Sequence, residues 1–134
     1  MYGLAALRIG YGLVPPWASE PLEKVRQPFN VGSPSVASAI AALSDRGHVR
    51  RVKNAVAKGR KVLEHGLLRL GLPPVRGQGN FVFLPMSDPS PASRYLLRKG
   101  IAIRALPGLG LRITVGRPSD NARVLSALRS WLSS

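Results

Sequence analysis

The chain has 134 residues, enough for one ordinary domain or a small domain with part of another, and its 45% hydrophobic content indicates a buried core. It has no cysteine, only two histidines, no signal-peptide pattern and no apolar run long enough to span a bilayer. This excludes disulfides and thiolate chemistry, and we expect a cytoplasmic protein without a membrane segment or metal site. The net charge of +14 is compatible with a polyanionic or phosphate ligand. The excess of arginine over lysine is also typical of a GC-rich genome, and we favour this second explanation of the charge.

Three elements are predicted in the first third of the chain. The apolar run 4–14 has the composition of a buried strand, and two prolines end it. A short helix is expected over 19–26 with Ser19 as its cap, and a helix rich in alanine over 33–43. A buried strand without a sheet to join indicates that this part belongs to something larger.

The clearest element is a long helix over 45–70. Apolar residues recur in it at steps of mostly three and four, which places them on one face. These residues are Val49, Val52, Val56, Leu63, Leu67 and Leu70. Gly71 and the prolines that follow it end the helix.

A mixed pattern follows the long helix. Strands are predicted over 81–84, 101–104 and 111–115, and helices over 91–99 and 119–132. This order predicts a small α+β domain over 46–134. The boundary with the first part, 1–45, is expected near residue 45.

Four blocks of the sequence carry a family resemblance. They are Tyr2–Tyr11 (YGLAALRIGY), Val25–Val31 (VRQPFNV), Gly79–Val82 (GNFV) and Leu111–Gly116 (LRITVG). In this order they resemble the carboxy-terminal portion of histidinol-phosphate aminotransferases, which are class I/II, fold-type I enzymes that depend on pyridoxal phosphate. The resemblance implies that residues 1–45 are a remnant of the α/β cofactor-binding large domain, and residues 46–134 the small domain.

Two arginines match binding residues of that family. Arg8 corresponds to the arginine that binds the cofactor phosphate, and Arg112 to the one that binds the substrate α-carboxylate. A guanidinium suits both tasks because its fixed fork of donors pairs bidentately with carboxylate or phosphate oxygens. In a strand, Arg112 should point away from the face that Leu111 and Ile113 bury.

Arg104 ends the strand before Arg112. By resemblance it would contact the phosphate of the substrate, although an arginine closing a strand at the surface explains it equally well. The related threonine-phosphate decarboxylases and aromatic aminotransferases share much of this layout, so the branch stays open. The activity implied is transfer of an amino group between histidinol phosphate or imidazole-acetol phosphate and glutamate or 2-oxoglutarate.

The lysine that forms the Schiff base with the cofactor in the family would lie just before Met1. The resemblance therefore implies a chain without that lysine, inactive alone and weak in binding the cofactor. Three explanations stay open: a longer gene, a separate upstream half-enzyme that completes the site, or a non-catalytic basic module. Homodimers are usual in the family.

The hypothesis of a basic binding module rests on the cations in the first half of the long helix. Arg46, Arg50 and Lys53 would lie on one face and could follow a phosphate backbone. The aromatic residues expected between them for single-stranded nucleic acid are missing, so we do not expect nucleic acid to be the partner.

Overall fold

A computed structural model describes residues 2–134 of the chain. They divide into two compact units, Met1–Val52 and Lys53–Ser134. Met1, the position expected to follow the family's lysine, lies outside the described residues. Within residues 2–134, no helix combines the length and the apolar character that crossing a membrane requires.

The strand predicted over 4–14 is wrong. Ala5–Leu7 form a 3-10 turn, η1, and residues 8–14 are irregular. A strand needs a neighbour for its N–H and C=O groups. Within the described residues the sheet belongs to the other unit, so the run 4–14 has no strand partner in its own unit.

The helices of the first unit are α1 (Pro16–Val25) and α2 (Ser33–Ser44). Helix α1 starts at Pro16 rather than after Ser19, because proline fixes φ near the helical value and suits the first helical position. None of the described residues in η1, α1 or α2 is buried, and Phe29 is fully exposed. These elements therefore contribute nothing to a hydrophobic core.

The long helix is confirmed as α3 (Arg46–Arg69). Only its second half buries the predicted stripe, through Leu63 and Leu67. Gly71 adopts a positive φ of 73°, which lets the Leu72 N–H donate to the Leu67 carbonyl at 3.0 Å and close the helix end.

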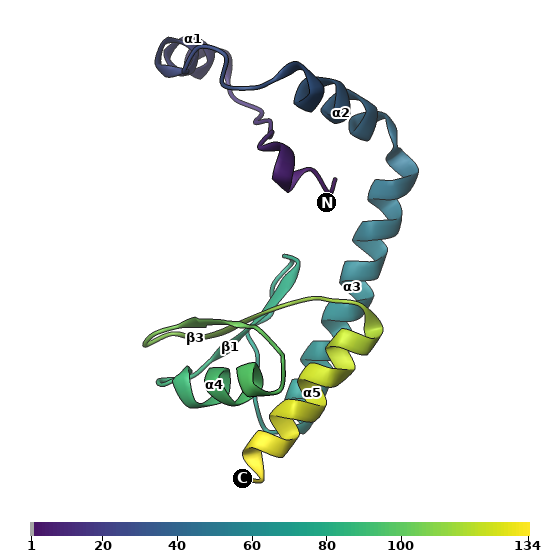
Figure 1. The fold of residues 1–134 in the computed structure, drawn as a ribbon, viewed down its shortest axis with the longest axis vertical. Helices are drawn as coiled ribbons and strands as arrows, with labels where there is room; N and C mark the ends of the chain where they lie inside the picture. The colour runs from purple at the N-terminus through teal and green to yellow at the C-terminus, as the bar shows by residue number, and fades with distance from the viewer. Residues whose placement is uncertain (1) are drawn as a thin grey trace. The chain divides into compact units, whose positions relative to one another are not determined.

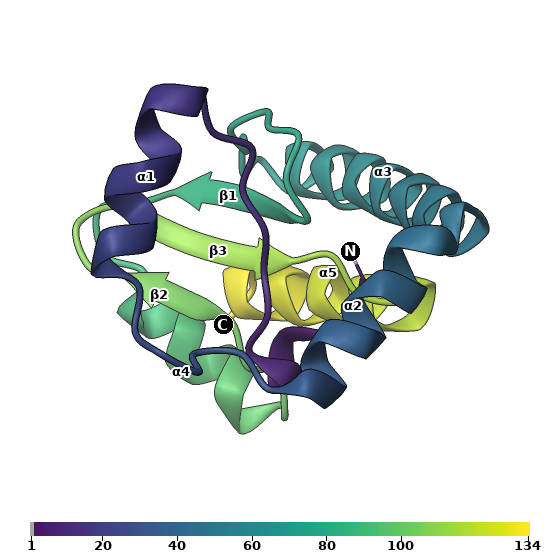
Figure 2. The same ribbon diagram turned by 90° about the horizontal axis from the view of Figure 1, so that it is seen from above.

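The second unit contains a three-stranded antiparallel sheet of β1 (Phe81–Pro85), β2 (Arg104–Leu106) and β3 (Gly110–Thr114) in the order β1-β3-β2. Figure 2 shows β3 between its two neighbours. The strand predicted over 101–104 begins only at Arg104. The reason is that the Ile101 N–H donates to the Leu96 carbonyl at 2.9 Å, so residue 101 still completes the end of the preceding helix.

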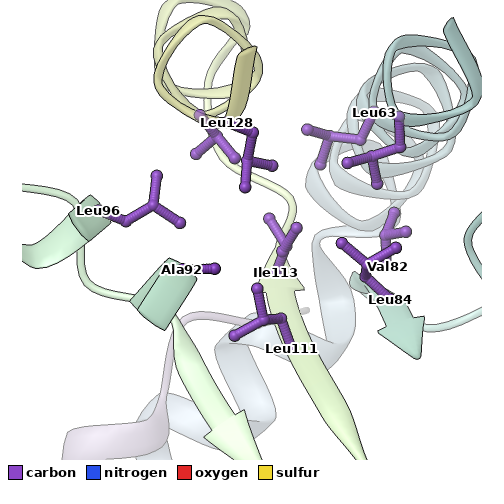
Figure 3. Packing of buried hydrophobic residues seen from close by; sticks show 10 residues of the cluster. Leu63, Val82, Leu84, Ala92, Leu96, Leu111, Ile113 and Leu128 are labelled. Carbon is purple, nitrogen blue, oxygen red and sulfur yellow. The ribbon is translucent and has the colours of Figure 1, made fainter. Parts of the chain in front are cut away.

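Helices α4 (Ser90–Arg98) and α5 (Pro118–Leu132) pack with the second half of α3 against one face of this sheet (Figure 1). Side chains from all three helices and from β1 and β3 point toward one another in this core (Figure 3). The buried residues are Leu63, Leu67, Val82, Leu84, Ala92, Leu96, Leu111, Ile113, Val124 and Leu128. The second unit is thus an α+β unit with its own core.

Asn121 ties the end of β3 to α5. Its side chain is 2% exposed, accepts from the Gly116 N–H at 2.9 Å and donates to the Gly116 carbonyl at 3.2 Å. Asn121→Ala is expected to destabilise the fold by about 1–3 kcal/mol, because it leaves both backbone groups without this partner. Urea unfolding measures the loss. Ser126→Ala, an exposed change on the same helix, serves as control, and an equal effect of both variants would contradict the assignment.

Asp120 stabilises the start of α5. Its carboxylate accepts from the Arg117 backbone N–H at 3.1 Å and from the Arg117 Nε at 3.2 Å. These hydrogen bonds, the backbone one first, lower the pKa of Asp120. Because the folded pKa lies below the unfolded value of about 3.9, the stabilisation is complete above that value and is lost as pH falls through the folded pKa.

Asp120→Asn should accordingly lower the melting temperature near neutral pH. At a pH below both pKa values the variant and the wild type should melt alike, since Asp120 is then protonated in both the folded and the unfolded states. Thermal unfolding followed by circular dichroism at the two pH values tests this. An equal difference at both would show that the charge of Asp120 is irrelevant.

Candidate functional site

The side chains of β3 alternate between the buried core and the opposite face of the sheet. Leu111 and Ile113 are fully buried against the helices, whereas Arg112 is half-buried on the opposite face of the sheet. This confirms the alternation predicted from the sequence. The same strand therefore builds the core with one set of side chains and presents a guanidinium with the other.

Arg104 and Arg112 lie directly opposite each other in the β2–β3 pairing. Opposed residues of an antiparallel pair point to the same face, so the two cations share one face of the sheet. Within residues 2–134, neither arginine forms an ion pair with a carboxylate. Two like charges in this position repel each other, and an anion between or beside them relieves that repulsion.

The guanidinium of Arg112 has two further features. Its carbon lies 5.6 Å from the centre of the Phe81 ring. Its Nε is buried and has no hydrogen-bond partner among the described residues. A buried donor without an acceptor is costly, and an anion's oxygen is one group able to satisfy it.

Arg8 belongs to the other unit. It is exposed, follows η1 in a left-handed conformation with φ 50°, and its Nη1 donates to the Ala5 carbonyl at 3.0 Å. Its Nε and Nη2 have no partner among residues 2–134. Ser35, in the first turn of α2, donates to the carbonyl of Leu7 at 3.0 Å and holds the turn before Arg8.

The donor set of Arg8 fits the phosphate of a pyridoxal cofactor, since unused N–H groups of a guanidinium bind phosphate oxygens bidentately. A cavity of about 470 Å³ in the same unit does not fit that phosphate, because no cation lines it. Tyr2 and Tyr11 both line this cavity, and a hydrogen bond with Tyr11 raises the pKa of Tyr2. Lys24, the first lysine of the chain, lies in α1 and pairs with Glu20 at 2.7 Å.

Two residues had no predicted role in the site, Phe81 at Arg112 and Arg60 next to the segment before Phe81. Phe81 is read from the sequence as a strand residue, and only the pairing of β1 with β3 brings its ring beneath Arg112. Arg60 belongs to the basic run of α3, yet its Nη1 donates to the Gly79 carbonyl at 3.0 Å. No local sequence signal distinguishes Arg60 from the exposed cations around it.

Comparison with known proteins gives a consistent result. The profile of the aminotransferase class I and II family matches residues 1–128. A histidinol-phosphate aminotransferase 2 from Pseudomonas fluorescens (strain Pf0-1) is 41% identical over 137 residues, which cover 98% of this chain and 37% of that protein. A histidinol-phosphate aminotransferase from Akkermansia muciniphila is 37% identical, with the same coverage of each chain.

A crystal structure shows the same fold. Histidinol-phosphate aminotransferase from Sinorhizobium meliloti, solved in complex with pyridoxal-5'-phosphate, superposes with a TM-score of 0.83 at 28% identity, over 98% of this chain and 38% of that one. The chain belongs to the class I and II aminotransferase family. Among curated relatives it is similar to histidinol-phosphate aminotransferases, and it spans 37% of the length of the two named above.

Proposed function

We propose that the chain is the carboxy-terminal part of a pyridoxal-phosphate-dependent transaminase. Its reaction would exchange an amino group between histidinol phosphate or imidazole-acetol phosphate and glutamate or 2-oxoglutarate. The observation that carries this proposal is the pair of arginines, Arg104 and Arg112, which face the same side of the sheet without a carboxylate partner among the described residues. Relatives named for this reaction support it.

The pair suits two alternating substrates that carry different anionic groups. Arg112 would bind the α-carboxylate common to glutamate and 2-oxoglutarate, while Arg104 would bind the phosphate that histidinol phosphate carries. One guanidinium for each anion explains how a single site accepts two partners of different shape. A phosphate or carboxylate also removes the repulsion between the two cations.

Arg8 would anchor the phosphate of the cofactor with its two unused donor nitrogens. The cofactor, when bound, supplies the electron sink that makes the substrate's α-hydrogen acidic. The role of this chain is then to hold cofactor and substrate through their anionic groups.

The rest of the site would come from chain outside these residues, either in one polypeptide or in a separate half-enzyme, and the assembled protein would be a cytoplasmic homodimer. We propose that residues 1–45 belong to the large cofactor-binding domain and residues 46–134 to the small domain. The isolated chain should then bind the cofactor weakly and turn over no detectable substrate.

A chimera tests the proposal. The chain is joined to the part of the Pseudomonas fluorescens relative that it does not cover. The chimera should take up pyridoxal phosphate, show a visible absorbance that borohydride removes, and transaminate histidinol phosphate with 2-oxoglutarate. The isolated chain is the control without activity.

Two outcomes would contradict the proposal. A folded chimera that takes up no cofactor would refute the family role of these residues. A loaded chimera that releases carbon dioxide from threonine phosphate, or prefers aromatic amino acids to histidinol phosphate, would move the protein to one of the neighbouring branches.

A further inference from the structure

The ring of Phe81 lies beneath the guanidinium of Arg112. We propose that Phe81 is a positioning residue for Arg112, and that Arg60 of α3 holds the backbone next to Phe81 in place. The inference rests on the proposed function in one respect, namely that Arg112 binds a carboxylate.

The sheet register explains why these two side chains meet. Phe81 is opposite Thr114, so it is the diagonal neighbour of Arg112 on the same face. Diagonal neighbours in an antiparallel pair are within reach of aromatic and long side chains. Phe83, which lies directly opposite Arg112, has no ring contact with a cation in the part of the chain described, so the contact is specific to Phe81.

An aromatic ring can position a guanidinium without using up its donors. The negative face of the ring attracts the cation, while the N–H groups point outward in the guanidinium plane. A carboxylate in the same place would hold Arg112 but compete with any anionic ligand for those donors. Because Arg104 repels Arg112 across the strand pair, the attraction to Phe81 also counteracts displacement of Arg112.

Phe81 is in turn supported by the segment before it. The Phe81 ring lies so close to Gly79 that a Cβ there would be 3.0 Å from the ring atom Cε1. The Gly79 carbonyl accepts from Arg60 Nη1 at 3.0 Å, and the Asn80 carbonyl accepts from the Val115 N–H at 2.9 Å. Any side chain at residue 79 would therefore crowd the ring.

Arg60 differs from the other cations of α3 by its burial. Its side chain is only 18% exposed, and its Nε lies 3.7 Å from Oε1 of Glu64, whose side chain is 19% exposed. Arg60 thus bridges Glu64 and Gly79 within the Lys53–Ser134 unit. The structure assigns it to support of the Phe81 segment rather than to a ligand.

The test uses the full chain labelled with ¹⁵N and follows the side-chain Nε–H signals of arginine. Arg112→Lys and Arg104→Lys assign the two signals. In the wild type, the ring current of Phe81 should shift the Arg112 signal, and a high heteronuclear NOE should show that the side chain is held. Phe81→Leu should remove the shift and lower the NOE, whereas Phe81→Tyr should keep both.

Phe83→Leu is the matched control, since it removes a ring from the same strand and face and should leave the Arg112 signal shifted. Arg60→Met should reduce the shift in part, because the segment before Phe81 loses the hydrogen bond from Arg60 to the Gly79 carbonyl. Pentafluorophenylalanine at position 81 keeps the shape of the ring but reverses its charge distribution. It should lower the NOE of Arg112 even if Phe81→Leu fails to fold.

Titration of the cofactor-loaded chimera described above with 2-oxoglutarate adds a functional readout. Phe81→Leu should weaken its binding roughly two- to thirty-fold, the range expected for loss of a cation–π contact. If neither Phe81→Leu nor the fluorinated ring changes the Arg112 signal, the positioning role is overturned. If instead Arg112→Lys binds 2-oxoglutarate as the wild type does, or the wild type does not bind it, the carboxylate role fails while the ring effect is still measured.

Discussion

Gly110→Ala is expected to remove a large part of the stability of the Lys53–Ser134 unit. Gly110 begins β3 with φ 146°, and a Cβ there would overlap the carbonyl oxygen of Leu84 on the neighbouring strand. Backbone strain and overpacking each cost about 1–3 kcal/mol, so the sum is about 2–6 kcal/mol. Small domains are stable by about 5–15 kcal/mol, which makes this a large part of the total.

Urea unfolding followed by tryptophan fluorescence and circular dichroism measures the change. Gly108→Ala is the control, because Gly108 has a positive φ of 70° but open space around its Cα. That variant should lose only about 1 kcal/mol, from strain alone. Similar losses in both variants would mean that strain, and not the contact with Leu84, decides the effect at Gly110.

Arg112→Ala should lower kcat/KM of the chimera for glutamate by roughly 10- to 200-fold. This corresponds to loss of a charge-assisted hydrogen-bonded contact worth about 1.5–3 kcal/mol. Arg112→Lys should fall between the wild type and the alanine variant, because an ammonium keeps the charge but not the bidentate fork. Steady-state kinetics with each amino donor provides the measurement.

Two variants make this result specific. Arg129→Ala changes an exposed arginine of α5 and should leave kcat/KM unaltered. Arg104→Ala should reduce kcat/KM for histidinol phosphate but not for glutamate, which lacks the phosphate. Equal losses for both substrates in the Arg104 variant would contradict the division of roles between the two arginines.

Local patterns were sufficient for the core-facing residues of β3 and α3 in the second unit. The alternation of Leu111, Arg112 and Ile113 predicts one buried face and an arginine on the opposite face, and the structure confirms this. The stripe of α3 likewise predicts Leu63 and Leu67 in the core. In both cases the residues that define the pattern lie within one element, so no knowledge of the tertiary structure is needed.

The sequence was misleading where the outcome depends on a neighbour. The run 4–14 is apolar enough for a buried strand, but a strand forms only if another strand accepts its hydrogen bonds. Residues 101–103 have strand composition as well, yet Gly100 with φ 72° ends α4 in a way that commits Ile101 to the helix end. Backbone hydrogen bonding determined the conformation of both segments: the run 4–14 lacks a strand partner, and Ile101 closes the end of α4.

The candidate site was only partly visible for the same reason. Arg104 and Arg112 can each be selected from the sequence, but their opposition depends on the register set by residues 107–109. Phe81 lies far from Arg112 in sequence and reaches it only through the β1–β3 pairing. Arg60 reaches the segment before Phe81 only through the contact of α3 with Gly79.

The residues of β3 that pack the core are different from those that form the candidate site. Core packing depends on Leu111 and Ile113, whereas the chemistry of the open face depends on Arg112 and its cross-strand neighbour Arg104. Replacing the two guanidinium groups leaves the packed layer beneath them intact. If the two arginines bind substrate as proposed, substrate preference could diverge by mutation of these positions while the scaffold is inherited unchanged.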